Sequence, residues 1–178
     1  FFFIFGLIIS VIINSIKKNS KMIDTKIELD QLKGTWHIIY TNFPMWLKGD
    51  KTDPMISYMI ENKNNVIGLR DQVDYQNNGK ISSIIGFDKP LNNLNTKFEW
   101  RGKGIIGLLT SNWEIIYMED KLDWLIIHFE KTIFTPAGYD VLSKNKLPFE
   151  NQLIDFQNKL RELNLLDQLT ALRLSNHE

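Results

Sequence analysis

The chain has 178 residues and a formal net charge of zero, because 21 Lys and Arg balance 21 Asp and Glu. This length suits one domain with a sizeable core, and the balanced charge argues against nucleic acid or an anionic membrane surface as a partner. The absence of cysteine excludes disulfides, thiolate metal sites and a cysteine nucleophile. The stability of the fold must therefore come from packing.

Residues 1–21 form a leader that differs from the rest of the chain. Phe1–Ile13 is almost wholly apolar, and a polar, lysine-bearing segment follows it. The apolar run is shorter than the ~20 residues that a spanning helix needs, so no integral membrane domain is predicted. Two interpretations stay open. A native signal or anchor implies a secreted, periplasmic or membrane-tethered protein, and translation from Met22 implies a cytoplasmic one. In both cases we expect the fold to lie in residues 22–178.

The stretch Leu32–Tyr40 predicts the start of a β-sheet. A short helical turn is expected before it, ending near Gly34, and an apolar run with strand character follows Trp36. Glycine lets two backbones approach closely, and an indole is too large to leave in water. We therefore expect Trp36 to plug one end of the sheet.

Short strands separated by turn signals are predicted along the rest of the chain. Pro44 keeps the aromatic-bearing segment 42–50 out of a central strand, and this loop is a candidate cover for a barrel mouth. The Asn77-Asn78-Gly79 stretch is the strongest hairpin signal. Strands are expected at residues 35–41, 55–61, 66–75, 81–87, 96–101, 113–118, 124–130 and 139–143. About eight such strands predict an all-β, antiparallel, closed up-and-down barrel.

The last segment changes to a helical period. Apolar residues recur there at alternating spacings of four and three, which predicts an amphipathic helix after Pro148 that ends near Asn164. The residues of this stripe are Phe149, Leu153, Phe156, Leu160 and Leu163. We expect the helix to lie across the outside of the barrel.

These features together resemble the lipocalins, most closely their bacterial-type branch. The resemblance rests on Gly34-Thr35-Trp36 after a helical turn, on the strand order and on the late helix. It extends to an acidic turn before Trp124, where the family carries an aromatic residue. The family also carries an arginine over the motif tryptophan, and Lys144 stands at that position here. Lysine can lay its stem on an indole but lacks the flat guanidinium.

The candidate ligand-binding residues follow from strand alternation, in which every second side chain faces the same side. Counting from Trp36, this period places Ile38 and Tyr40 on the inner face, and later strands carry aromatic residues at alternate positions. The predicted lining is Ile38, Tyr40, Tyr58, Phe98, Trp100, Trp113, Ile115 and Tyr117. A barrel of eight strands can enclose one small ligand or be filled by its own side chains.

Other motifs carry no chemistry in this reading. Gly102–Gly107 matches the dinucleotide fingerprint, but a strand rather than a helix is expected after it. The histidines lack metal-ligand spacing, and His128 alone, in an apolar strand, has a candidate ligand-facing role besides that of a barrel-wall residue. We predict no metal site and no cofactor.

The resemblance implies that the barrel binds a small hydrophobic molecule, such as a fatty acid, lipid, isoprenoid or pigment, for carriage or storage. Tyr40, Tyr58 or Tyr117 would orient a polar end of the ligand. Two alternatives stay open. One is an enzyme of the isomerase or de-epoxidase type on the same fold, which rests on family analogy. The other is a filled barrel that acts through its surface. The sequence sets no oligomeric state.

Overall fold

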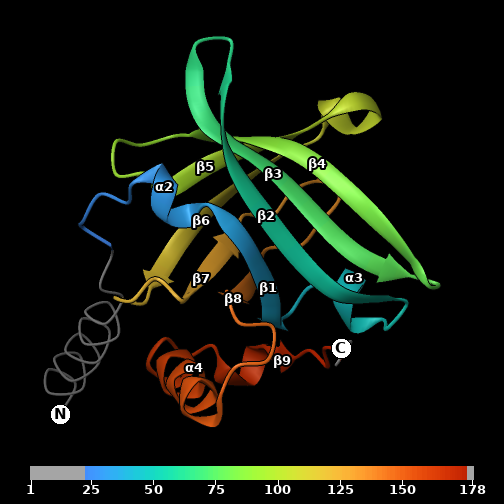
Figure 1. Cartoon of the computed structure of the whole chain (residues 1–178), viewed down its shortest axis with the longest axis vertical. Coiled ribbons are helices and arrows are strands. Elements are labelled where there is room, and N and C mark those ends of the chain that lie inside the picture. Colours follow the sequence, from blue (N-terminus) through green and yellow to red (C-terminus); the bar gives the residue numbers. More distant parts are fainter. Residues whose placement is uncertain (1–22, 176–178) are drawn as a thin grey trace, which may run out of the picture.

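The computed structural model describes residues 23–175, and within them the chain forms a closed antiparallel β-barrel (Figure 1). Each strand pairs with the next along the chain, and β1 (Gly34–Thr41) pairs with both β2 and β8, which closes the sheet. The other barrel strands are β2 (Lys51–Lys63), β3 (Val66–Asn77), β4 (Lys80–Pro90), β5 (Lys97–Gly102), β6 (Thr110–Met118), β7 (Trp124–Phe129) and β8 (Gly138–Ser143).

The predicted fold class is confirmed: eight strands form an up-and-down barrel with a C-terminal helix. A ninth strand, β9 (Thr170–Ala171), pairs with the end of β1 and was not expected from the sequence. The predicted leader, residues 1–21, lies outside the described residues. No helix within residues 23–175 is both long and apolar enough to cross a membrane.

One end of the barrel is closed by the short helix α2 (Leu29–Leu32) and by Trp36. Gly34 has a φ of 107°, which a residue with a side chain rarely adopts, and it lets the chain turn from α2 into β1. The indole of Trp36 is fully buried, and its Nε1 donates a hydrogen bond to the carbonyl oxygen of Leu32 at 2.7 Å. The Nζ of Lys144 lies 5.0 Å from the centroid of that ring. The predicted contact between Lys144 and Trp36 is therefore present.

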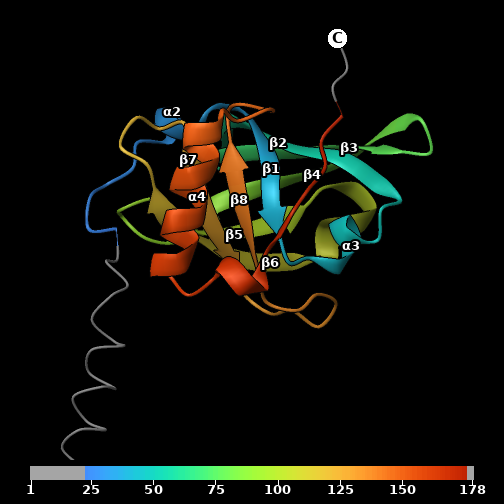
Figure 2. The same ribbon diagram turned by 90° about the horizontal axis from the view of Figure 1, so that it is seen from below.

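The opposite end of the barrel is covered by the segment after β1, which includes the short helix α3 (Pro44–Leu47), as Figures 1 and 2 both show. The ring of Phe43 packs edge-on against Phe129 at 5.3 Å, and Trp46 packs edge-on against Tyr75 at 5.5 Å. The 3-10 helix η1 (Gly104–Leu108), where the dinucleotide-like glycines lie, connects β5 to β6 at this same end.

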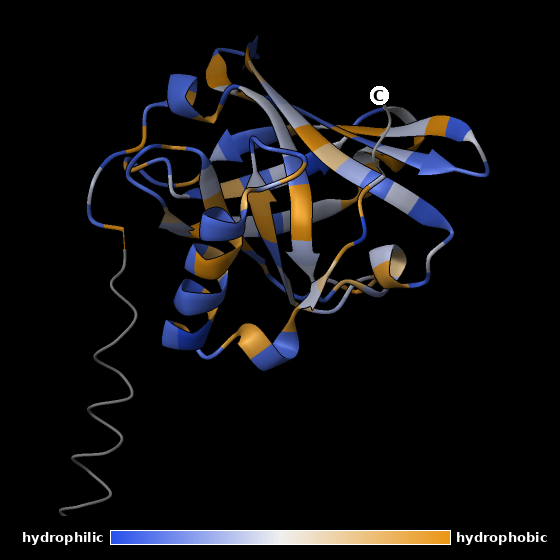
Figure 3. Ribbon diagram, turned by 60° about the horizontal axis from the view of Figure 1, so that its bottom comes forward, coloured by the Kyte–Doolittle hydropathy of each residue, from blue (hydrophilic) through white to orange (hydrophobic). Residues whose placement is uncertain are grey.

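The helix α4 (Glu150–Glu162) lies on the outside of the barrel, beside β7, β8 and β1 (Figure 2). It is mostly hydrophilic with isolated apolar residues (Figure 3), and Phe156 and Leu160 are the ones that are buried. The ring centroid of Phe156 lies 4.7 Å from that of Trp124 on β7. Asn164 ends the helix with a φ of 57°, as predicted, whereas Phe149 precedes the helix and is exposed.

Two irregularities in the sheet change which side chains face inward. The pairing register shifts between Ile38 and Tyr40 on β1, and between Ile115 and Tyr117 on β6. Each shift inserts one extra residue and reverses the alternation beyond it. The prediction that Tyr40 and Tyr117 face the interior is therefore wrong, because both pack outside the barrel, in the cluster that includes α4.

The burial of Trp36 leads to a stability prediction. Trp36→Ala removes a fully buried indole and its hydrogen bond, so we expect the free energy of unfolding to fall by about 3–5 kcal/mol. Urea unfolding followed by circular dichroism measures the change. The neighbouring control Thr35→Ala removes only an exposed hydrogen bond to Ser57, and it should cost about 1 kcal/mol or less. Equal effects of the two substitutions would contradict the role of Trp36 as a plug.

Candidate functional site in the barrel interior

Aromatic rings stack on one another inside the barrel. The ring of Trp113 lies at their centre, with centroids 4.4 Å from Phe98, 6.0 Å from Tyr58 and 6.4 Å from Phe129. Phe98, Tyr58 and Trp113 are buried, and the first two stack face to face with the indole. A ligand at this level of the barrel has to displace at least one of these rings.

Most of the predicted lining residues lie in the interior. Ile38, Tyr58, Phe98, Trp113 and Ile115 are buried in one cluster, and half-buried Trp100 packs against it. The indole of Trp100 lies over Gly86 on β4, where a Cβ atom would overlap its Nε1. Only glycine leaves room there for the indole. Whether these side chains bind a ligand stays a prediction.

The interior also holds three buried carboxyl groups that the sequence analysis did not single out. They belong to Asp71 on β3, Asp88 on β4 and Asp140 on β8, with exposed fractions of 6%, 0% and 3%. We call them the interior carboxyls. Asp88 Oδ1 accepts a hydrogen bond from Trp113 Nε1 at 2.7 Å. This bond links Asp88 to the packed rings of Tyr58, Phe98, Trp113 and Phe129, which we call the aromatic cluster.

When all three are ionised, each interior carboxyl has one oxygen without a hydrogen-bond donor. These atoms are Asp71 Oδ1, Asp88 Oδ2 and Asp140 Oδ1, and they are the buried side-chain oxygen and nitrogen atoms without a partner in the described part of the chain. When one of the pair is protonated, Asp71 and Asp88 share a hydrogen bond with each other, and Asp140 accepts one from Thr41. Buried polar groups in folded proteins are nearly always hydrogen-bonded, because water is lost without compensation otherwise. When the carboxyls are ionised, the interior therefore presents hydrogen-bond acceptors that lack donors.

Strand pairing places the interior carboxyls opposite residues that are themselves buried or packed in the interior. Asp71 lies directly across from Tyr58 on β2, and Asp140 lies across from Thr41 on β1. Asp88 lies across from Leu69 and Trp100. These partners are inward-facing or packed against the interior cluster. None of the ion pairs formed within residues 23–175 involves an interior carboxyl.

Burial makes the charged form of these groups costly. It raises the pKa of Asp140 to about 7. It also raises the pKa of Asp71 and Asp88, and the charge of Asp71 raises that of Asp88 further. The pKa of the Tyr58 phenol is raised well above its usual value by burial first and then by the carboxylates of Asp71, Asp88 and Asp140. The four groups are thus electrostatically linked.

The interior carboxyls do not form a metal site. Across residues 23–175, no three His, Cys, Asp or Glu side chains are grouped closely enough to hold a metal ion.

The remaining predicted residues lie outside the barrel. Trp124 packs between Tyr117 and Phe156, with ring centroids 4.7 Å from each. The Nδ1 of His128 lies 3.4 Å from Glu114, and its ring packs against Tyr139. His128 therefore does not face the interior and belongs to the barrel wall.

The sequence contained a signal for the interior carboxyls. Leu69, Asp71 and Val73 fall at alternate positions of one predicted strand, so the alternation used for the aromatic residues would have placed Asp71 inside. Asp71 is polar, and the predicted lining contains only apolar and aromatic residues.

Solved structures share this architecture. Insecticyanin from the tobacco hornworm Manduca sexta aligns over 88% of this chain and 88% of its own, with 15% identity and a TM-score of 0.64. The cockroach allergen Per a 4 aligns over 89% and 97%, with 14% identity and a TM-score of 0.62. The siderocalin Ex-FABP aligns over 83% and 96%, with 14% identity and a TM-score of 0.60. These proteins are lipocalins.

The chain has the lipocalin fold. No protein-family model matches the sequence, and no curated protein does either, so the likeness is one of structure. At these identities the lipocalin fold is what the likeness establishes, and the ligand has to be argued from the site.

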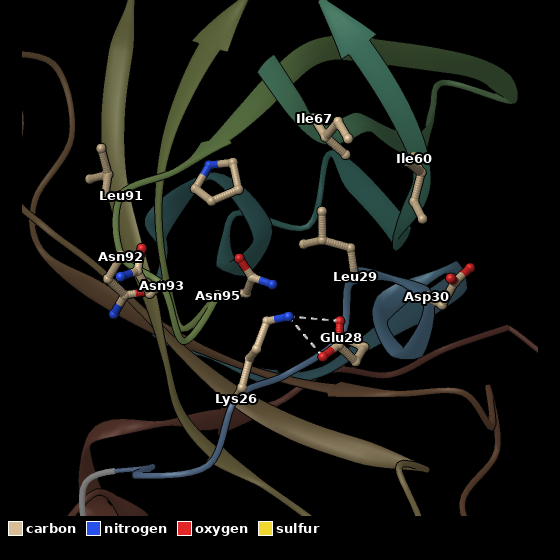
Figure 4. Close-up of a pocket in the computed structure, with 11 residues that line it drawn as sticks. Lys26, Glu28, Leu29, Asp30, Ile60, Ile67, Leu91, Asn92, Asn93 and Asn95 are labelled. Carbon is tan, nitrogen blue, oxygen red and sulfur yellow. Dashed lines mark hydrogen bonds and ion pairs between the residues drawn. The ribbon is translucent and has the colours of Figure 1, made fainter. Parts of the chain in front are cut away.

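A hollow lies outside the barrel, beside α2 (Figure 4), with a volume of about 750 Å³. It is lined by apolar side chains that include Leu29, Ile60 and Ile67, and by polar ones that largely pair with their neighbours. Lys26 Nζ lies 2.9 Å from Glu28 Oε1, and Asn95 Nδ2 donates to the carbonyl oxygen of Ile27. Several of its polar side chains thus pair with neighbours in the chain.

The interior carboxyls predict an unusual dependence of stability on pH. Between about pH 4 and pH 7 the native state keeps protons that the unfolded chain has lost, so the free energy of unfolding should fall as the pH rises. Each carboxyl contributes a slope of at most about 1.4 kcal/mol per pH unit. Urea unfolding at pH values across this window measures the slope. His37, whose pKa burial lowers, acts in the opposite direction below pH 6.5.

The substitution Asp140→Asn removes one titrating group and should flatten this slope. Asp74→Asn, on the outer face of β3, is the matched control and should leave the slope unchanged. Stability that rises steadily from pH 4 to pH 7 in the unmodified protein would contradict the raised pKa values.

Proposed function

We propose that the barrel interior binds a small molecule with a largely apolar body and a polar end, for carriage or storage. The observation that carries this proposal is the set of buried carboxyl oxygens that lack a hydrogen-bond donor when the groups are ionised. A barrel interior that served only for packing would gain nothing from them, because each buried polar atom without a partner costs about 1–3 kcal/mol. A bound molecule that supplies the missing donors would offset this cost.

The aromatic cluster supports an apolar body for the ligand. Tyr58, Phe98 and Trp113 offer flat faces next to the interior carboxyls, and ligand sites typically combine such apolar walls with a few placed polar groups. The stacked rings also show that binding requires a rearrangement. A side chain has to turn away, or the covering segment with Phe43 and Trp46 has to lift.

Exposed apolar side chains surround the covered end of the barrel. Ile105 and Leu108 of η1, and Ile133 and Phe134 between β7 and β8, are each at least 74% exposed. A hollow of about 320 Å³ lies where these two connections meet. An apolar molecule would meet this surface first, before it enters the interior.

The structural neighbours are consistent with a binding role. The siderocalin Ex-FABP functions through dual ligand specificities, which places ligand binding among the uses of this fold. The nature of the ligand in this chain is argued from its own residues.

A neutral fluorescent probe tests the proposal. N-phenyl-1-naphthylamine should bind saturably, with a rise in its emission, because its rings can replace an aromatic side chain of the interior. Val73→Trp adds bulk on the inner face of β3 and should weaken binding about 5- to 150-fold, since overpacking costs about 1–3 kcal/mol.

Met59→Trp adds the same side chain at a half-exposed outer position of β2 and is the matched control. Thermal melting checks that both variants are folded. Absence of saturable binding, or equal binding by the two variants, would contradict an interior site and favour a filled barrel that acts through its surface. Chemical conversion of a bound molecule would favour the enzyme alternative.

A further inference from the structure

We propose, resting on the interior binding site argued above, that the polar end of the ligand is a protonated amine held by the adjoining carboxyl groups of Asp71 and Asp88, with Asp140 adding negative charge to the same interior. The ligand class is therefore an organic cation with an apolar or aromatic body. When they are ionised, the interior carboxyls lack a group that donates hydrogen bonds to them.

The missing partner must be a hydrogen-bond donor. The unpartnered atoms are carboxyl oxygens, which accept hydrogen bonds when ionised. An ammonium group carries three N–H donors and no acceptor, so it satisfies such oxygens without bringing an unsatisfied acceptor of its own. A ligand with a carboxylate end would add a further acceptor and a further negative charge. The donors and acceptors of the interior therefore disfavour acidic ligands, including fatty acids.

The charge of the interior points the same way. The buried charged residues of the described chain are Asp71, Asp88 and Asp140, all acidic. Tyr58 faces them, and no ion pair formed within residues 23–175 brings a lysine, arginine or histidine to them. A buried carboxylate is retained at reasonable cost only when a cation or donors compensate it. A bound ammonium ion supplies both.

The aromatic cluster fits a cation as well. Trp113 is joined to Asp88 by a hydrogen bond of 2.7 Å and presents its ring beside Tyr58 and Phe98. The face of an indole attracts ammonium ions, most strongly where water is excluded. The same rings can stack with an aromatic body. Asp88 and the aromatic rings therefore lie together inside the barrel, and a cation reaches the face of the indole once Phe98 or Tyr58 turns away from it.

Binding should displace protons from the site. In the free protein, burial favours the protonated form of the interior carboxyls, with the pKa of Asp140 at about 7. An ammonium ion binds the ionised form, so it competes with protons for these groups. Amine affinity should rise as the pH rises from about 6 to about 8, because alkyl amines stay protonated over this range. A ligand held by apolar contacts alone would show no such dependence.

A matched ligand series tests the inference by isothermal titration calorimetry. 2-Phenylethylamine, 2-phenylethanol and 3-phenylpropanoate share one aromatic body and differ in the polar end. At pH 7.5 we expect the amine to bind at least about tenfold more tightly than the alcohol, and the carboxylate to bind most weakly. Titrations in two buffers of different ionisation enthalpy should show proton release with the amine and none with the alcohol.

Two substitutions separate the carboxyls from the rest of the site. Asp88→Asn and Asp140→Asn keep the shape of the side chain and remove its charge, so each should reduce the preference for the amine over the alcohol. Asp74→Asn, on the outer face of β3, should leave the preference unchanged. Proton release in the unmodified protein needs no variant, so a variant that fails to fold leaves the inference testable.

The outcomes distinguish the two proposals. Equal affinity for amine and alcohol, or the absence of proton release, overturns the amine assignment, while saturable binding of N-phenyl-1-naphthylamine upholds the interior site. If neither the probe nor any member of the series binds, the interior site itself is overturned. Tightest binding by the carboxylate overturns the amine assignment and favours an acidic ligand.

Discussion

Closure of the sheet through β1 is the constraint on which the other features depend. Because β1 pairs with β2 on one side and β8 on the other, the barrel has no open edge and its inner face is shut off from water along its length. Trp36 seals one end, and the segment with Phe43 and Trp46 covers the other. Any polar group on the inner face must therefore find its partner inside. Three aspartates that would be ordinary on a surface are buried by this enclosure, and their burial is the reason we propose a ligand for them.

Much of the fold was predictable from the sequence because local patterns and long-range packing agree. The turn signals and the period of two located the strands, and the period of the late stripe located α4. The inner face was predictable only up to the points where the sheet is irregular. The bulges after Ile38 and Ile115 reverse the alternation, so that Tyr40 and Tyr117 pack under α4 instead of facing inward. Bulges are set by how neighbouring strands pair, and a single strand's sequence does not show them.

The polar part of the site was missed for a different reason. The resemblance implies a hydrophobic ligand, so the predicted lining consists of apolar and aromatic residues and omits Asp71 and Asp88. Their burial depends on the whole barrel being closed around them, which one strand's sequence does not reveal. We interpret the aromatic cluster and the interior carboxyls as two parts of one binding site. The rings supply an apolar enclosure, and the enclosure makes the charge of each carboxyl costly until a cation compensates it.

The central claim is that the carboxyls of Asp71, Asp88 and Asp140 lie inside the barrel with no cation beside them, and that a bound cation compensates their charge. Carbon-13 NMR titration of the aspartate side chains tests it most directly, in the free protein and with saturating 2-phenylethylamine. In the free protein we predict aspartate carboxyls that titrate at about pH 7 or above, well above the usual pKa of an aspartate. With the amine bound, the pKa of these groups should fall. Titration of every aspartate near pH 4 in the free protein, or raised pKa values that the amine leaves unchanged, would contradict the account.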